Sequence, residues 1–193
     1  MNLQHEFDVP ASPQATLELL LDAERVVPCM PGATLVEVAG DTWKTTMSVK
    51  LGPVGMDFVN DVRIVEQDPA SGRARLAVKG RDTRGRGGAE ASVDTRLIAV
   101  DGGGTHVTMD ADVKFSGQAA QLGRPSVIQD ISTRLVNEFA ECIRTKLDSA
   151  SSADDHQQAQ KSVSGLSMLV AAMSGALARL FHLRPGPREK GSP

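Results

Sequence analysis

The chain has 193 residues, of which 40% are hydrophobic and 23% charged, a balance that predicts one globular domain with room for an additional segment. Aromatic residues make up only 3%, with one tryptophan and no tyrosine, which argues against a nucleic-acid surface built from stacked rings. The net charge of −3 is unevenly distributed: residues 161–193 carry five basic side chains and one acidic one, whereas residues 1–160 carry 16 basic and 23 acidic ones. The acidic body should therefore repel phosphate polymers, and the basic tail should be attracted to an anionic surface.

The N-terminal segment reads as a strand followed by a helix. "LQHEFDV" alternates apolar and polar residues, which is typical of a half-buried strand. Ser12 is a good N-cap and Pro13 suits the first helical position, so we predict one helix that ends near "PCMPG". The chain starts on this strand without a charged and then apolar leader, and the expected location is the cytoplasm.

Five or six further strands should follow as a meander. The strand patterns cover residues 42–51, 56–64, 74–80, 89–97 and 106–115, and connectors such as "DPASG" and "DGGG" suit hairpin turns. Residues 125–147 then show apolar positions at helical spacing over more than five turns. The order strand, helix, meander, long helix predicts an α+β fold in which a curved antiparallel sheet wraps on the long helix.

The apolar face of this sheet combines small and flexible side chains. Alanines leave volume between sheet and helix, and methionines adapt to it, so either an apolar cavity or a solid core fits the pattern. Asn60 is the strongly polar residue on this face, and its amide must bond either to core backbone or to a ligand oxygen. The residues expected to line a cavity are Met47, Phe58, Asn60, Ala91, Val93, Met109, Leu135 and Phe139.

The sequence offers no catalytic or metal-binding constellation. The four histidines are far apart, the serines lack a nucleophile-elbow context, and we predict no enzyme activity and no bound metal. Cys29 and Cys142 match neither a disulfide framework nor a metal site, and we interpret them as buried, reduced thiols. The arginine-rich loop 80–88 lies between two strands, so it is either a solvated hairpin tip or a docking site for an acidic partner.

The C-terminal region has three predicted parts after the domain of residues 1–147. Residues 148–161 form a polar linker, residues 162–184 an amphipathic helix, and residues 185–193 a disordered basic tail. The helix suits a bilayer interface better than a span, although docking on the body or on a partner helix also fits. The residues expected to bind the membrane are Leu166, Leu169, Val170, Met173, Leu177, Leu180, Phe181, Arg179 and Arg184.

Several separated motifs resemble one known family. They are "PCMPGA", "LGPVGMDFVNDVRIVEQDP", "KGRDTRGRGGAEASVDTRL", "GGGTHVTMDADVKFSGQAAQLG" and "LVNEFAECI". In this order, over about residues 1–147, they resemble the carbon monoxide dehydrogenase CoxG family, which is part of the START-like helix-grip superfamily. The resemblance implies an accessory of a molybdenum hydroxylase-type carbon monoxide dehydrogenase, and it favours the cavity over the solid core.

The resemblance and the residues together give a functional hypothesis. The protein would bind the cytoplasmic face of the cell membrane peripherally, hold a lipid-soluble quinone (menaquinone or ubiquinone) without a covalent cofactor, and couple the dehydrogenase to the respiratory quinone pool. Two alternatives stay open at this point, an assembly or maturation factor that recruits the dehydrogenase to the membrane, and a general lipid carrier.

Overall fold

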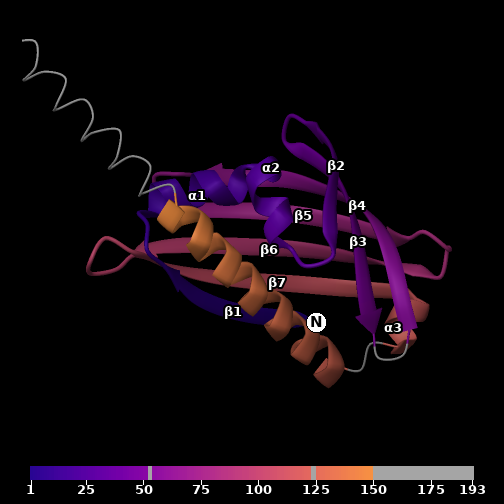
Figure 1. The fold of residues 1–193 in the computed structure, drawn as a ribbon. Helices are drawn as coiled ribbons and strands as arrows, with labels where there is room; N and C mark the ends of the chain where they lie inside the picture. The colour runs from indigo at the N-terminus through magenta and orange to yellow at the C-terminus, as the bar shows by residue number, and fades with distance from the viewer. Residues whose placement is uncertain (52–53, 123–124, 150–193) are drawn as a thin grey trace, which may run out of the picture. The chain divides into compact units, whose positions relative to one another are not determined.

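The alternating segments form one seven-stranded antiparallel sheet (Figure 1), in a computed structural model that describes residues 1–51, 54–122 and 125–149. The strand order is β1-β7-β6-β5-β4-β3-β2, so β2 to β7 form the predicted meander and β1 closes the far edge. The strands are β1 (Asn2–Val9), β2 (Ala33–Ala39), β3 (Thr42–Leu51), β4 (Val54–Asp68), β5 (Arg73–Asp82), β6 (Gly87–Ala99) and β7 (Thr105–Gly117). The α+β architecture expected from the sequence is confirmed.

β2 is the sixth strand of the meander, and the sequence of residues 33–39 does not show clear strand alternation. It lies at an edge of the sheet, its register with β3 shifts between Leu35 and Glu37, and Val36 is 61% exposed. An irregular edge strand loses the strict period of two, which explains why its pattern was ambiguous.

The predicted N-terminal helix is broken into three short pieces. Its start is as expected, since the hydroxyl of Ser12 accepts a hydrogen bond from the amide of Ala15. Asp22 ends the first piece and caps the second by accepting from the amides of Glu24 and Arg25. The pieces are α1 (Pro13–Leu21), α2 (Ala23–Val26) and the 3-10 turn η1 (Val27–Cys29).

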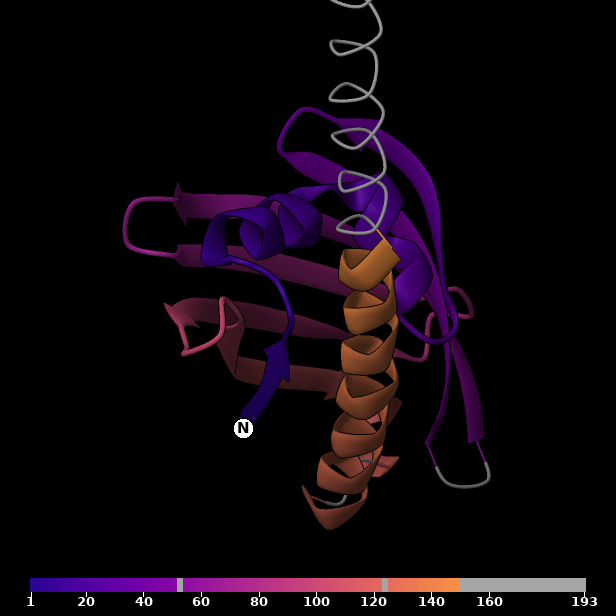
Figure 2. The ribbon, with the colours of Figure 1, turned by 60° about the vertical axis from the view of Figure 1, so that its left-hand side comes forward.

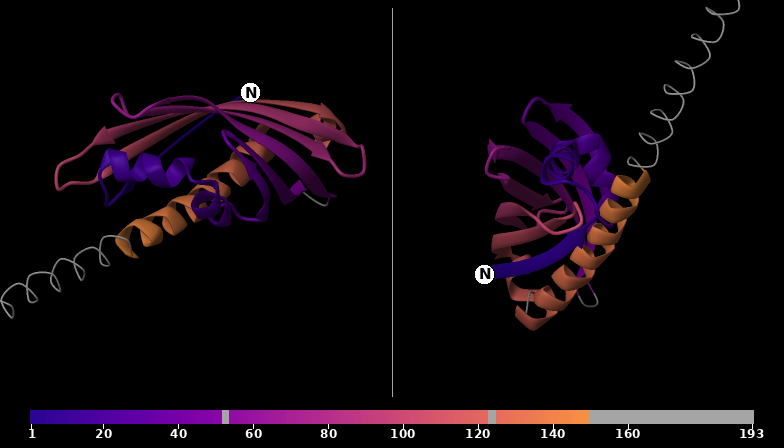
Figure 3. Two further views of the ribbon diagram at one scale, coloured as in Figure 1. Left: turned by 90° about the horizontal axis from the view of Figure 1, so that it is seen from above. Right: turned by 90° about the vertical axis from the view of Figure 1, so that its left-hand side faces the viewer.

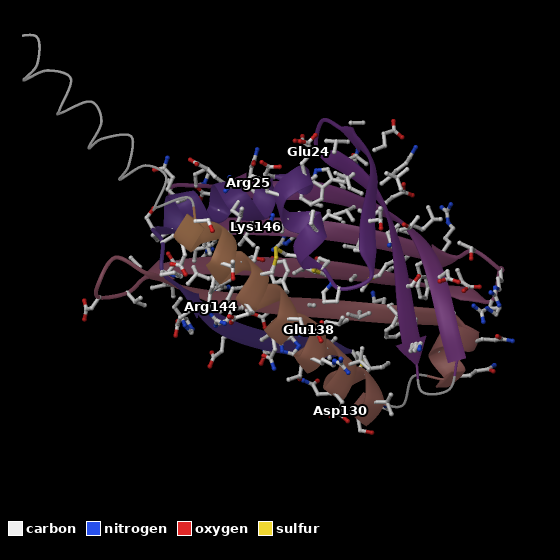
Figure 4. All side chains as sticks on the ribbon, viewed as in Figure 1. Glu24, Arg25, Asp130, Glu138, Arg144 and Lys146 are labelled. Carbon is white, nitrogen blue, oxygen red and sulfur yellow. A yellow bond between two sulfur atoms is a disulfide. The ribbon has the colours of Figure 1, made fainter. Side chains whose placement is uncertain are left out.

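The long helix, residues 125–149, follows the short α3 (Gln118–Leu122) and crosses the concave face of the sheet (Figures 2 and 3). It extends two residues beyond the predicted end at Leu147, so Asp148 and Ser149 are helical and do not begin a linker. Near its C-terminal end Ile143 and Leu147 are fully packed. The charged side chain of Glu138 is exposed, whereas Arg144 is half-buried and donates a hydrogen bond to the carbonyl of Asp8 (Figure 4).

The cysteines form a disulfide, and the expectation of two reduced thiols was wrong. Cys29 in η1 and Cys142 in the long helix are bonded, with their Cα atoms 5.4 Å apart (Figure 4). They are separated by 113 residues in the sequence, so spacing alone gave no sign of the pair. The bond fixes the segment after α2 against the long helix.

The arginine-rich loop is a hairpin turn between β5 and β6, stabilised from within. The buried carboxylate of Asp82 accepts hydrogen bonds from the guanidinium of Arg86 at 2.7 and 2.9 Å and from the backbone amides of Arg84 and Arg86. The Arg86 bonds hold the pKa of Asp82 well below its ordinary value. Arg86 also donates to the carbonyl of Gly55, whereas Arg81 and Arg84 are exposed.

Residues 1–149 form one compact unit, and the predicted membrane-binding residues, the amphipathic helix 162–184 and the tail 185–193 lie outside the described residues. Within the described ranges, no helix combines the length and apolar character needed to cross a bilayer.

We expect the double variant Cys29→Ser, Cys142→Ser to lose about 2–5 kcal/mol of unfolding free energy relative to the oxidised protein, because a link across so many residues restricts the unfolded chain. Denaturant titrations with and without reductant measure this difference. The double variant serves as its own control, since its midpoint should not respond to reductant. A wild-type midpoint that reductant leaves unchanged would contradict the bond.

Arg86→Gln should destabilise the fold most at neutral pH. The folded-state pKa of Asp82 lies below its unfolded value, so its contribution is present above pH about 4 and is lost as the pH falls through the folded pKa. The stability difference between wild type and variant should therefore narrow in acid, as measured by urea titration at several pH values. Arg84→Gln, at an exposed position in the same turn, is the matched control, and an equal loss there would refute the assignment.

Candidate functional site

Two apolar cavities lie between the inner face of the sheet and the helices. The first, called here the α1 cavity, has a volume of about 220 Å³, and its walls include Leu17, Leu21, Met30, Trp43, Leu76 and Val93. The second, called the distal cavity, has a volume of about 230 Å³, and its walls include Val49, Phe58, Ala91, Phe115, Ile131 and Leu135.

The side chains of the long helix show why space remains here. Ile143 is fully buried and Phe139 is 5% exposed, but Ile131 and Leu135 are only half-buried although they face the sheet. A straight helix can pack closely against a curved sheet over only part of the helix's length. Over the remaining length, the small side chains of Ala89 and Ala91 do not fill the space between sheet and helix. The hollow therefore follows from the sheet's curvature and the small residues of β6.

Three residues, Met47, Asn60 and Val78, line both cavities, and we call them the waist. Together the cavities offer about 450 Å³, which is within the usual range of roughly 300–1,000 Å³ for a small-molecule site, whereas each alone is below it. A ligand of ordinary size would have to occupy both.

All eight residues predicted to line a cavity do line one. Phe58, Ala91 and Leu135 lie at the distal cavity, Val93, Met109 and Phe139 at the α1 cavity, and Met47 and Asn60 at both. That these residues bind a ligand stays a prediction. Sequence reasoning missed the wall formed by Leu17, Leu20 and Leu21, although their i, i+3, i+4 spacing marks an inward helix face.

Asn60 forms the polar feature of the waist, and its partner is neither of the two expected from the sequence. Its side-chain nitrogen donates to the hydroxyl of Thr45, directly opposite on β3, at 3.3 Å. On its other side Gly80 of β5 makes room, because a Cβ at that position would lie 2.5 Å from the amide oxygen of Asn60. The amide thus lies across three strands, with its nitrogen toward β3 and its oxygen toward β5.

Other polar groups near the cavities are few. Thr95 lines the α1 cavity, and Ser132 of the long helix lines the distal one. The hydroxyl of Ser132 lies 3.0 Å from Nε2 of His5, and burial lowers the pKa of that imidazole. Among the described residues, no group of three or more His, Cys, Asp or Glu side chains could hold a metal ion.

Solved structures similar to this chain share its fold at low sequence identity. A conserved protein from Geobacillus kaustophilus matches with a TM-score of 0.69 and 16% identity, over 78% of this chain and 97% of that one. An aromatase/cyclase, Zhui, from Streptomyces sp. R1128 matches with 0.53 and 14%, over 77% and 93%. A START superfamily protein from Mycobacterium smegmatis matches with 0.52 and 12%, over 77% and 98%. These likenesses confirm the START-like helix-grip fold.

Sequence comparison identifies the family. None of the curated proteins matches the chain. The family model for CoxG, a carbon monoxide dehydrogenase protein, matches residues 6–148, which is most of the chain and nearly all of the compact unit. The resemblance inferred from the separated motifs is thereby confirmed, and the chain belongs to the carbon monoxide dehydrogenase CoxG family.

Proposed function

We propose that this protein is a non-catalytic accessory of a molybdenum-containing carbon monoxide dehydrogenase and that it carries a lipid-soluble quinone in the joined cavities. Family membership supports the enzyme partner. The ligand is inferred from the pair of apolar cavities. Together they have the volume of a small-molecule site, and their walls are almost wholly hydrophobic.

A quinone fits both the reaction of the dehydrogenase and the apolar character of the cavities. Oxidation of carbon monoxide releases two electrons, which need an acceptor, and a quinone accepts two electrons and two protons. Its isoprenoid tail is apolar and gains roughly 25 cal/mol per Å² of surface removed from water, so an apolar cavity would hold it well. A fold shared with an aromatase/cyclase does not by itself decide between carrier and enzyme. The carrier role is supported by the apolar walls of both cavities, which contain few polar side chains.

The C-terminal segment would supply the membrane contact. Its apolar stripe (Leu166, Leu169, Val170, Met173, Leu177, Leu180 and Phe181) and the basic residues that include Arg179 and Arg184 suit the interface of an anionic bilayer. Peripheral attachment at the cytoplasmic face would let the domain exchange quinone between bilayer and enzyme.

Filling the hollow should remove the quinone at little cost in stability. We expect Val93→Trp to lower the quinone recovered by organic extraction and mass spectrometry at least tenfold, while the unfolding free energy falls by less than the roughly 1–3 kcal/mol typical of an overpacked core. Ser92→Trp, on the opposite face of the same strand, is the matched control and should keep its quinone. Wild-type protein purified from quinone-containing cells without any bound quinone would refute the ligand, and the assembly factor or general carrier would then stand.

Truncation after Ser149 should leave a folded domain that no longer sediments with anionic liposomes, because residues 1–149 form a compact unit without the tail. In the full chain, Arg179→Gln with Arg184→Gln should weaken sedimentation mainly at low salt, since screening already reduces these charges at high salt. Zwitterionic liposomes serve as the control. A truncated protein that still sediments with anionic lipid would show that attachment lies in the domain.

A further inference from the structure

Asn60 at the waist and its cross-strand neighbour Thr45 depart from the apolar pattern of the inner face. Asn60 is 9% exposed and Thr45 is 6% exposed, and they are cross-strand partners on β4 and β3. Gly80, the partner of Asn60 on β5, is the one inward position there without a side chain. An amide, a hydroxyl and a space for the amide oxygen are thus grouped at and beside the waist.

Counting hydrogen bonds leaves this pair with unused capacity. An asparagine amide has two N–H donors and an acceptor oxygen, and a threonine hydroxyl has one donor and can accept two bonds. In the described part of the chain these side chains make a single hydrogen bond, from the Asn60 nitrogen to the Thr45 oxygen. One N–H, one O–H and the amide oxygen form no hydrogen bond with the described residues and are therefore available to a ligand or to water.

The volumes of the two cavities limit the shape of a ligand that could contact Asn60 and Thr45. Either cavity alone is smaller than an ordinary ligand site, and the polar pair lies between them and not at an end. A molecule that fills both must place its middle at the waist and apolar parts on either side.

The geometry points to Asn60 and Thr45 as a specificity site for an elongated apolar ligand that carries a carbonyl or hydroxyl oxygen within its length. The free N–H and O–H can donate to a carbonyl, and the amide oxygen can accept from a hydroxyl. This inference rests on the proposed quinone-carrier function and deepens it, because the same site then holds the quinone through its carbonyl and the quinol through its hydroxyl.

The only tryptophan, Trp43, lines the α1 cavity and reports on binding, since a quinone close to an indole quenches its emission. Menaquinone-2 is the tailed probe and menadione, the ring without a tail, the short one. We expect Thr45→Val with Asn60→Leu to weaken menaquinone-2 binding about tenfold, the effect of losing about one hydrogen bond. Thr46→Val, which removes an exposed hydroxyl from the opposite face of β3, is the matched control and should change affinity less than twofold.

Blocking each cavity separately tests whether the ligand spans both. Val93→Phe narrows only the α1 cavity and Ala91→Phe only the distal cavity. Both should weaken menaquinone-2 binding at least tenfold, while menadione should respond to only one of them. Thermal melting of each variant without ligand shows whether it is folded. If the double variant Thr45→Val, Asn60→Leu does not fold, the conservative variant Asn60→Gln replaces it in the test. Because it keeps the amide, it should keep part of the wild-type affinity.

The outcomes separate the two hypotheses. If wild-type protein binds neither probe, the quinone-carrier function itself fails. If it binds menaquinone-2 but the Thr45 and Asn60 changes leave affinity unaltered, or only one cavity matters to the tailed probe, the carrier function stands and the specificity site is refuted.

Discussion

The structure depends on how one helix covers a sheet that is wider and more curved than the helix itself. Where the long helix meets the sheet closely, near its C-terminal end, Ile143 and Leu147 are packed with Val107 and Leu97 in a large core cluster. Toward its N-terminal end Ile128 is buried, and Ile131 packs against a second, smaller cluster formed by Met56 and Phe58. The space between these clusters becomes the two cavities, so the hollow is a consequence of incomplete cover and not of a missing element.

The α1–η1 segment closes the part of the inner face that the helix does not reach. Leu17 and Leu19 place this segment in the large cluster, and the bond from Cys29 to Cys142 ties its end to the long helix. Cavity walls give up the close contacts of a solid core, which lowers stability. A cross-link and a well-packed end offset that loss, while Leu20, Leu21 and Met30 remain partly exposed at the wall of the α1 cavity.

Much of this could be predicted from the sequence because strand alternation is a local property. The inward positions of β3, β4, β6 and β7 followed from a period of two, and so did the polar Asn60 among them. Three features were not local. The disulfide joins residues 113 apart, the break at Asp22 depends on one carboxylate capping the next turn, and the division into two cavities depends on the waist, where three strands meet. The burial of Asp82 could not be predicted either, because the arginine-rich sequence of this loop is typical of a solvated hairpin tip.

The waist is where the chain gives up stability without a local reason. A leucine at position 60 would continue the apolar face, and an alanine at position 80 would cost less unfolded-chain entropy than glycine. Instead Asn60 and Gly80 face each other, and the absence of a Cβ at position 80 is what admits the amide oxygen. Such paired departures from otherwise consistent patterning are typical of functional positions. Here they coincide with the place that any molecule filling both cavities must occupy, which ties the cost of the buried amide to recognition of a ligand.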